Sequence, residues 1–200
     1  MNKVERIIYD MVKANPKLKQ QLVESYQKLF SLLPSKPLTT EHSIRVREGF
    51  FYGFHDKCPW SADEQRLLAH RTEPRFRGRL SQKGDVMTVG YFHGPDYEQF
   101  QAIAETKAWN WQQGSMLQWL GCSSALVFND LEDGRQVCRI IDEDGTKRTL
   151  QSAVGALSPD GRYGLSYSFE RLGRGMHGYG YSQGEAERAH EALPNAEGLN

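Results

Sequence analysis

The sequence predicts a mainly β protein with an N-terminal α-helical extension, on three observations. Apolar residues recur at helical spacing up to about Pro37. From Glu48 onward they gather instead in short β-branched and aromatic segments separated by turn residues, and a short motif returns three times within these segments. The segments predict antiparallel sheets, because a parallel sheet would need a helix between successive strands.

Residues 1–37 are expected to form two helices that meet at Asn15 and Pro16. Asn caps helices well, and Pro is tolerated at the first helical position. The zone carries seven basic and three acidic residues, a net charge of +4. A basic amphipathic helix can lie on an anionic membrane surface. The spread of the lysines favours the alternative, a helical hairpin packed on the rest of the protein with its lysines solvated.

Ten strands are predicted between Glu48 and Phe169, and no convincing helix interrupts them. Gly, Asp, Asn and Pro lie between the segments and supply the positive φ angles and Asx hydrogen bonds of tight turns. The predicted strands are Phe50–Phe54, Arg66–His70, Val86–Phe92, Gln99–Ile103, Met116–Leu120, Ala125–Asn129, Gln136–Ile141, Arg148–Gln151, Ala153–Leu157 and Gly164–Phe169.

The repeated motif sets the expected architecture. Its copies begin at Trp60, Trp119 and Leu157, and Ser158–Arg162 (SPDGR) is the clearest form of its tight turn. The copies start 59 and 38 residues apart. This spacing brackets the roughly 40 to 50 residues of a four-stranded propeller blade, with an insertion in the first interval. We therefore expect a partial β-propeller, open or truncated, of about two and a half four-stranded antiparallel blades over residues 48–172.

Residues 173–200 are expected to be a Gly-rich loop followed by a disordered tail. From Glu185 onward the chain has four Glu and one Arg, and no apolar period. Such a segment buries too little apolar surface to offset the entropy of ordering it.

Composition argues against several classes of protein. With 25 basic and 25 acidic residues the net charge is zero, which gives no electrostatic basis for nucleic-acid binding. Apolar runs such as Ala125–Phe128 are far shorter than the roughly 20 residues that cross a bilayer, and no signal peptide opens the chain, so we expect a cytoplasmic protein. Cys58, Cys122 and Cys138 have no CxxC spacing and are expected to be reduced core thiols.

Four stretches of the chain resemble an uncharacterised family of bacterial WD40-like or TolB-like β-propellers. These stretches are Phe50–Ser61, Glu105–Trp119, Phe128–Asp130 and Leu157–Arg162. Genes of this family occur among those for surface polysaccharide synthesis and glycosyl transfer, and no activity is established for it. The resemblance covers about residues 20–181 and corresponds to the N-terminal part of the family.

The region of Gln118 and Trp119 also resembles oligogalacturonate lyases, which are propellers with a metal at the channel mouth. The His and Gln ligands of those lyases have no matched positions here. A closed propeller needs four or more blades. The expected array therefore has an unpaired edge, to be covered by the N-terminal helices, a second copy or a partner subunit, unless the chain is an incomplete copy.

Two stretches are candidate binding sites. His55, Asp56 and Lys57 are expected near the channel mouth, where their charges would bind a sugar, a carboxylate or a metal. The favoured alternative is that Asp56 bonds backbone amides of the next turn and pairs with Lys57.

The second stretch consists of Trp109, Asn110, Trp111, Gln112 and Gln113. Two indoles and three amides suit saccharide recognition. Equally, the tryptophans would fill the gap between blades while the amides bond loop carbonyls. Gln118 is a further candidate, and the glycines of 175–181 would let a backbone approach a ligand closely.

No catalytic motif is present: the sequence lacks GxSxG, HExxH and a Walker loop. Asp56 and Asp130 would be a candidate carboxylate pair if the fold brought them together. We expect a non-catalytic carbohydrate-related binding or scaffold module, in the context of bacterial surface polysaccharide synthesis, with no cofactor or metal and a saccharide as possible ligand. The alternative is a polysaccharide-processing enzyme, either a metal-dependent lyase or a glycosidase, or a truncated, inactive fragment of one.

Overall fold

The computed structural model describes residues 6, 12, 15–33, 41, 44–176 and 178–181. The chain divides into two compact units, Met1–Val46 and Arg47–Asn200. Of the first expected helix, only Arg6 and Val12 are described, and both are helical. The rest of that helix lies outside the described residues.

Helix α2 (Pro16–Ser31) confirms the second expected helix and its start. The side chain of Asn15 accepts a hydrogen bond from the backbone N–H of Leu18 at 3.3 Å, and Pro16 occupies the first turn. At the end of the helix, the backbone N–H groups of Leu32 and Leu33 donate to the carbonyl oxygens of Leu29 and Phe30, at 3.3 and 3.1 Å. Five of its apolar residues are exposed, namely Leu22, Val23, Tyr26, Leu29 and Phe30. Among the described residues, no helix is both long and apolar enough to cross a membrane.

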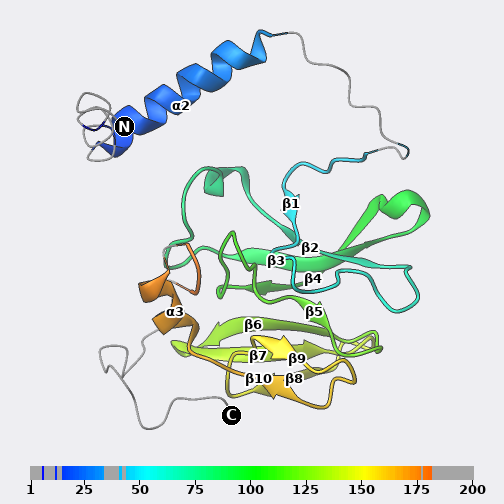
Figure 1. The fold of residues 1–200 in the computed structure, drawn as a ribbon. Helices are drawn as coiled ribbons and strands as arrows, with labels where there is room; N and C mark the ends of the chain where they lie inside the picture. Colours follow the sequence, from blue (N-terminus) through cyan, green and yellow to red (C-terminus); the bar gives the residue numbers. More distant parts are fainter. Residues whose placement is uncertain are drawn as a thin grey trace. The chain divides into compact units, whose positions relative to one another are not determined.

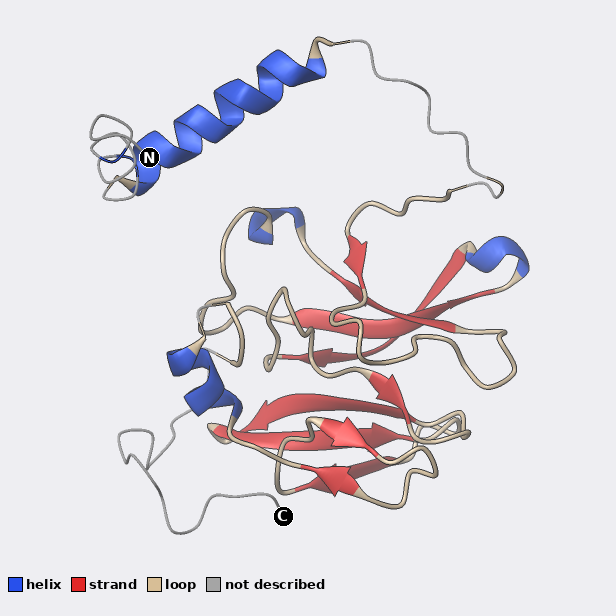
Figure 2. Ribbon diagram, in the orientation of Figure 1, coloured by secondary structure: helices blue, strands red, loops and turns tan. Residues whose placement is uncertain are grey.

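The second unit is mainly β, and its described residues form three antiparallel sheets (Figures 1 and 2). Two sheets have four strands and one has two, and strand order follows chain order in every sheet. The first sheet consists of β1 (Phe50–Phe51), β2 (Leu67–Arg71), β3 (Met87–His93) and β4 (Gln99–Thr106). The second consists of β5 (Gln118–Trp119), β6 (Leu126–Glu132), β7 (Arg135–Ile141) and β8 (Lys147–Leu150). The third consists of β9 (Ala156–Leu157) and β10 (Gly164–Leu165). Two short 3-10 turns, Pro74–Phe76 and Pro95–Tyr97, lie in the loops on either side of β3.

All ten predicted strands correspond to observed strands, but β1, β5 and β9 are shorter than predicted, and the last predicted strand runs into a helix. β10 ends at Leu165, and Phe169 begins helix α3 (Phe169–Gly175). The side chain of Ser168 caps this helix by accepting from the N–H of Arg171 at 3.3 Å. Phe169 stacks on Tyr181, with ring centroids 4.5 Å apart, and both rings are buried. The chain beyond Gly173 is thus helical at first rather than a loop from that point.

The repeated motif is a repeated structure. In each copy the first residue forms a β-bridge with the residue seven positions later: Trp60 with Leu67, Trp119 with Leu126, and Leu157 with Gly164. The first and third copies also share their turn bonds. Ser61 donates its hydroxyl to Asp63 at 2.6 Å, and Ser158 does the same to Asp160 at 2.5 Å. Each aspartate then accepts a backbone N–H two residues on. These bonds lower the pKa of both carboxyl groups.

Strand β6 packs on both of its faces, which explains the continuous apolar run at 125–128. Side chains alternate between faces along a strand. Leu126 and Phe128 join Leu68 and Val89 of the first sheet in one buried cluster. Ala125 and Val127 face the other way and pack with residues that include Val154 and, partly buried, Leu157 of β9. The second sheet is therefore packed between the first sheet and the β9–β10 hairpin, and the described sheets form no closed ring.

The first sheet requires a glycine at position 90. Gly90 lies at a register shift between β3 and β4, where a Cβ would come within 2.1 Å of the carbonyl oxygen of Gln101. Only glycine fits this close approach of two backbones.

Cys138 is buried, as predicted, and burial raises the pKa of its thiol to about 12. The prediction is wrong for Cys58 and Cys122, which lie exposed in the loops at 52–59 and 120–125 rather than on a packed strand.

Candidate functional site

The tryptophan loop, residues 109–114, is held inside the protein by its own side chains. Trp109 is 1% exposed and packs with Phe76 and Met87. Its indole N–H donates to the carbonyl oxygen of Asp85 at 3.0 Å. A saccharide needs an exposed aromatic face, and Trp109 has none. The structure places this residue in the core, in agreement with the alternative interpretation of the loop.

Asn110 and Gln113 together hold the backbone of Gly180, an arrangement we call the amide clasp. The side-chain N–H of Asn110 donates to the Gly180 carbonyl oxygen at 2.8 Å, and the Gly180 N–H donates to Gln113 Oε1 at 3.1 Å. Asn110 Oδ1 also accepts the backbone N–H groups of Gln112 and Gln113, at 2.9 and 2.8 Å. These two amides are therefore committed to internal bonds.

The position of Gly180 in the clasp requires a glycine. Gly180 has φ +67°, and a Cβ there would lie 1.9 Å from the carbonyl oxygen of Phe169 and 2.4 Å from the N of Gly173. The close backbone approach predicted for this segment is thus made to helix α3 rather than to a ligand. Tyr181, the next residue, is 1% exposed, and its hydroxyl oxygen accepts a hydrogen bond from Asn129 Nδ2 at 2.9 Å.

The remaining predicted binding residues are dispersed. Gln118 is buried and donates to the carbonyl oxygen of Met116 at 3.1 Å, whereas Gln112 is exposed. Trp111 is partly exposed, and its indole N–H donates to the carbonyl oxygen of Arg79 at 2.6 Å. Trp111 and Gln112 alone keep accessible surface on the tryptophan loop.

His55, Asp56 and Lys57 lie together in the loop that follows β1. Lys57 Nζ is 2.6 Å from Asp56 Oδ2, so these two charges compensate each other, as the favoured alternative predicted. His55 is exposed, and its ring lies 4.3 Å from that of Phe54. Asp130, the suggested partner of Asp56, instead accepts the N–H of Lys107 at 3.1 Å and pairs with Arg139 at 3.3 Å. The two aspartates take different partners, and no carboxylate pair is formed between them.

The structure contains a buried histidine–serine pair that we did not predict from the sequence. His70 Nε2 accepts the backbone N–H of Ser115 at 3.0 Å and lies 2.9 Å from its hydroxyl oxygen. Both residues are fully buried, and desolvation lowers the pKa of His70 to about 4. The ring also stacks on Phe51. A substrate has no access to this serine, so the pair does not form a nucleophile. It joins β2 of the first sheet to the residue that follows the tryptophan loop.

Asn129 is a second buried polar residue whose role we did not predict from the sequence. Its side chain bonds both backbone groups of Val154, at 2.8 and 3.0 Å, as a neighbouring strand would. Its backbone N–H donates to Ser115, and its carbonyl oxygen accepts from Thr106, both at 2.7 Å. Together with Tyr181, these bonds tie the two large sheets, the 153–155 loop and the 178–181 segment to one residue.

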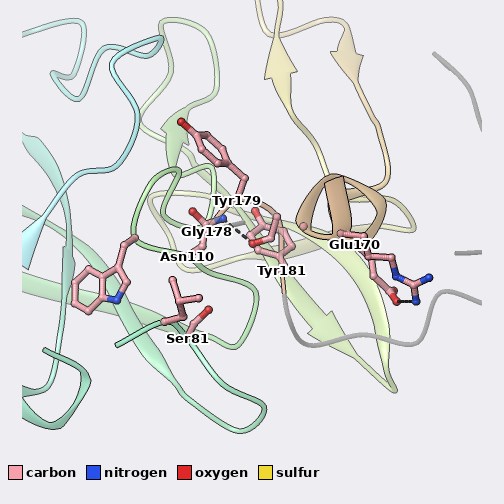
Figure 3. Close-up of a pocket in the computed structure, with 11 residues that line it drawn as sticks. Ser81, Asn110, Glu170, Gly178, Tyr179 and Tyr181 are labelled. Atoms are coloured by element: carbon pink, nitrogen blue, oxygen red, sulfur yellow. Dashed lines mark hydrogen bonds and ion pairs between the residues drawn. The ribbon is translucent and has the colours of Figure 1, made fainter. Parts of the chain in front are cut away.

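A cavity of about 350 Å³ lies beside the amide clasp (Figure 3). Asn110, Trp111 and Tyr181 line one side, and Glu170 and Arg174 of α3 line another. Arg174 and Glu170 are 3.3 Å apart and form an i,i+4 ion pair. The cavity is at the lower end of the roughly 300 to 1,000 Å³ of typical small-ligand sites, and its opposite charges are already paired.

The β9–β10 end of the unit exposes four large apolar side chains. These residues are Leu150, Tyr163, Leu165 and Tyr167, with 44, 69, 43 and 37% of their surface accessible. Among the described residues, β10 hydrogen-bonds to β9 alone. We call the open edge of β10, together with these apolar side chains, the hairpin edge.

The described residues contain no group of three or more His, Cys, Asp or Glu side chains that could hold a metal ion. No family model, curated protein or solved structure matches the chain.

Proposed function

We propose that this chain is a non-catalytic binding or scaffold module of the propeller type, and that it associates through the hairpin edge. Two successive four-stranded meanders, each with its strands in chain order, support the propeller assignment. A third copy of the same turn begins at Leu157. Stacked sheets of this kind are the repeating unit of propellers.

The observation that carries the proposal is the direction of the backbone groups in β10. The carbonyl oxygens of Tyr163 and Leu165 accept from Ser158 and Gly155, at 2.9 and 2.7 Å, so both face β9. Backbone groups alternate in direction along an antiparallel strand. The N–H and C=O of Gly164 therefore point away from β9, toward the side where β10 has no neighbour among the described strands. An edge of this kind pairs readily with another strand.

The partner that we propose is a second copy of this chain. Two antiparallel β10 edges related by a two-fold axis offer each other the same donors and acceptors, as an isologous dimer requires. Tyr163 and Leu165 lie on this edge and would be removed from water together with the strand. The family resemblance still supports carbohydrate-related binding. Asn110 and Gln113 no longer support it, because their amides bond the backbone of Gly180. No grouping of the described side chains favours the lyase or glycosidase alternative.

Two substitutions of one residue test the edge. Gly164→Pro removes the outward N–H, whereas Gly164→Ala keeps it, and a Cβ at this position has room because its nearest neighbour is 3.4 Å away. Light scattering is expected to give a dimer for the wild type and Gly164→Ala, and a monomer for Gly164→Pro. Leu165→Lys should also give a monomer, through repulsion across the axis. A monomeric wild type, or a dimer of unchanged strength in Gly164→Pro, would overturn the proposal.

A further inference from the structure

A second, larger cavity lies where the first sheet begins. Its volume is about 670 Å³, within the roughly 300 to 1,000 Å³ of typical small-ligand sites. The segment that leads into β1, the end of β2 and the turn at 74–77 supply its walls, and Trp111 of the tryptophan loop completes them. None of the binding residues predicted from sequence, except Trp111, belongs to this cavity.

Three arginines line the cavity, namely Arg47, Arg71 and Arg77. Arg71 lies over the ring of Phe100, at 5.5 Å from its centre, which leaves the guanidinium edge for other bonds. Arg77 is exposed, and its guanidinium has no hydrogen-bond or ion-pair partner among the described residues; only its backbone N–H is bonded, to the carbonyl oxygen of Pro74. Arg47 is 3.8 Å from Glu98, at the outer limit of an ion pair.

The acidic residues of the same walls do not balance these arginines. Glu73 bonds Arg75 through both carboxylate oxygens, at 2.7 and 3.0 Å, so its charge is taken up by a residue that does not line the cavity. Glu48 is the other acidic residue of the lining. The walls therefore carry an excess of positive charge, even though the whole chain has a net charge of zero. A concave surface of one sign concentrates ligands of the opposite sign.

The apolar part of the wall is flat and fixed. Trp111 is anchored by its bond to the Arg79 carbonyl oxygen, and it meets Trp109 edge-to-face at 89°. Phe51 packs against it with ring centroids 5.2 Å apart. A held, partly exposed indole offers a face for a sugar ring or an aromatic base.

We infer that this cavity binds a small anionic ligand, one that carries a carboxylate or phosphate group on a ring. The guanidinium groups of Arg71 and Arg77 would bond the anion, because the planar fork of arginine matches both carboxylate and phosphate. Trp111 would contact the ring. A sugar acid and a nucleoside monophosphate both have this chemistry. The inference concerns a surface other than the hairpin edge and does not depend on association there.

Calorimetric titration of the full chain tests the inference with three probes: glucuronate, uridine monophosphate and glucose. We expect at least one of the two anions to bind, glucose to bind far more weakly, and Arg71→Gln/Arg77→Gln to raise Kd about tenfold or more. Arg135→Gln, which removes an exposed arginine of β7, is the matched control and should leave Kd unchanged. Comparison of the two affinities then shows whether the cavity prefers the carboxylate of a sugar acid or the phosphate of a nucleotide.

Three results would overturn the inference. These are the absence of binding by both anions, equal binding by the double variant and the wild type, and glucose binding as strong as that of the anions. Circular dichroism of each variant checks that the proteins compared are folded. We expect the variants to fold, because the side chains of Arg71 and Arg77 are exposed.

Discussion

The side-chain amide of Asn110 donates to the carbonyl oxygen of Gly180 at 2.8 Å, although seventy positions separate the two residues. This bond joins the tryptophan loop to the last described segment of the chain. It also decides what the loop does, since an amide that is buried and bonded in this way serves the fold and is unavailable to a ligand.

Asn110→Ala should destabilise the protein by about 1 to 3 kcal/mol, because it leaves buried backbone groups of Gly180 and Gln113 without a partner. Gln112→Ala is the matched control in the same loop, and its exposed side chain predicts a much smaller change. Urea denaturation of both variants measures the difference. Equal stability of the two variants would contradict the clasp.

Trp109→Ala should cost about 3 to 5 kcal/mol, the usual penalty for removing a large buried side chain. It also removes the donor to the carbonyl oxygen of Asp85. The melting temperature is therefore expected to fall sharply. A variant that melts like the wild type but no longer binds a glycan would restore Trp109 as a ligand-stacking residue.

Gly180→Ala and Gly178→Ala compare two glycines with positive φ, +67° and +92°. An alanine at Gly178 meets nothing closer than 4.0 Å, so only the backbone strain of a non-glycine residue is expected. An alanine at Gly180 would also collide with the backbone of Phe169 and Gly173. Thermal unfolding should show a far larger loss of stability for Gly180→Ala, and similar losses for both variants would speak against close docking on α3.

Stability should depend on pH through His70. Its pKa is about 4 in the folded chain and near 6.5 when unfolded, so between these values only the unfolded chain takes up the proton. The contribution of His70 is complete above pH 6.5 and is lost as the pH falls toward 4, by about 3 kcal/mol in total.

Denaturation curves at several pH values in this window measure that loss, with His70→Gln as the comparison. The variant starts from lower stability but should lack this part of the slope. The same slope in both proteins would show that His70 does not remain neutral in the folded state.

The β architecture could be predicted because its signals are local. Turn residues such as Asp63 and Gly161 fix hairpins within a few positions, and the continuous apolar run at 125–128 is that of a strand that packs on both of its faces. Helix α3 was missed because its seven residues include Gly173 and Gly175, which lower helix propensity, and its stability comes from burying Phe169.

The site was harder to predict, since it depends on pairs that are distant in sequence. The bonds of Asn110 to Gly180, His70 to Ser115 and Asn129 to Val154 span 70, 45 and 25 positions. No spacing rule links such residues before the fold is known. The cavity with Arg71 and Arg77 has the same origin, because its arginines and Trp111 come from the segment before β1, the end of β2, the turn at 74–77 and the tryptophan loop.

Amide hydrogen exchange at Gly164, followed as the protein concentration rises from micromolar to millimolar, tests the proposed association most directly. Pairing of two β10 edges should slow exchange of the outward Gly164 N–H in step with dimer formation. Gly134, in the turn between β6 and β7, has no neighbour within 4 Å of an added Cβ and should exchange at a constant rate. A Gly164 amide that exchanges equally fast at every concentration, in a protein that stays monomeric, would contradict the account.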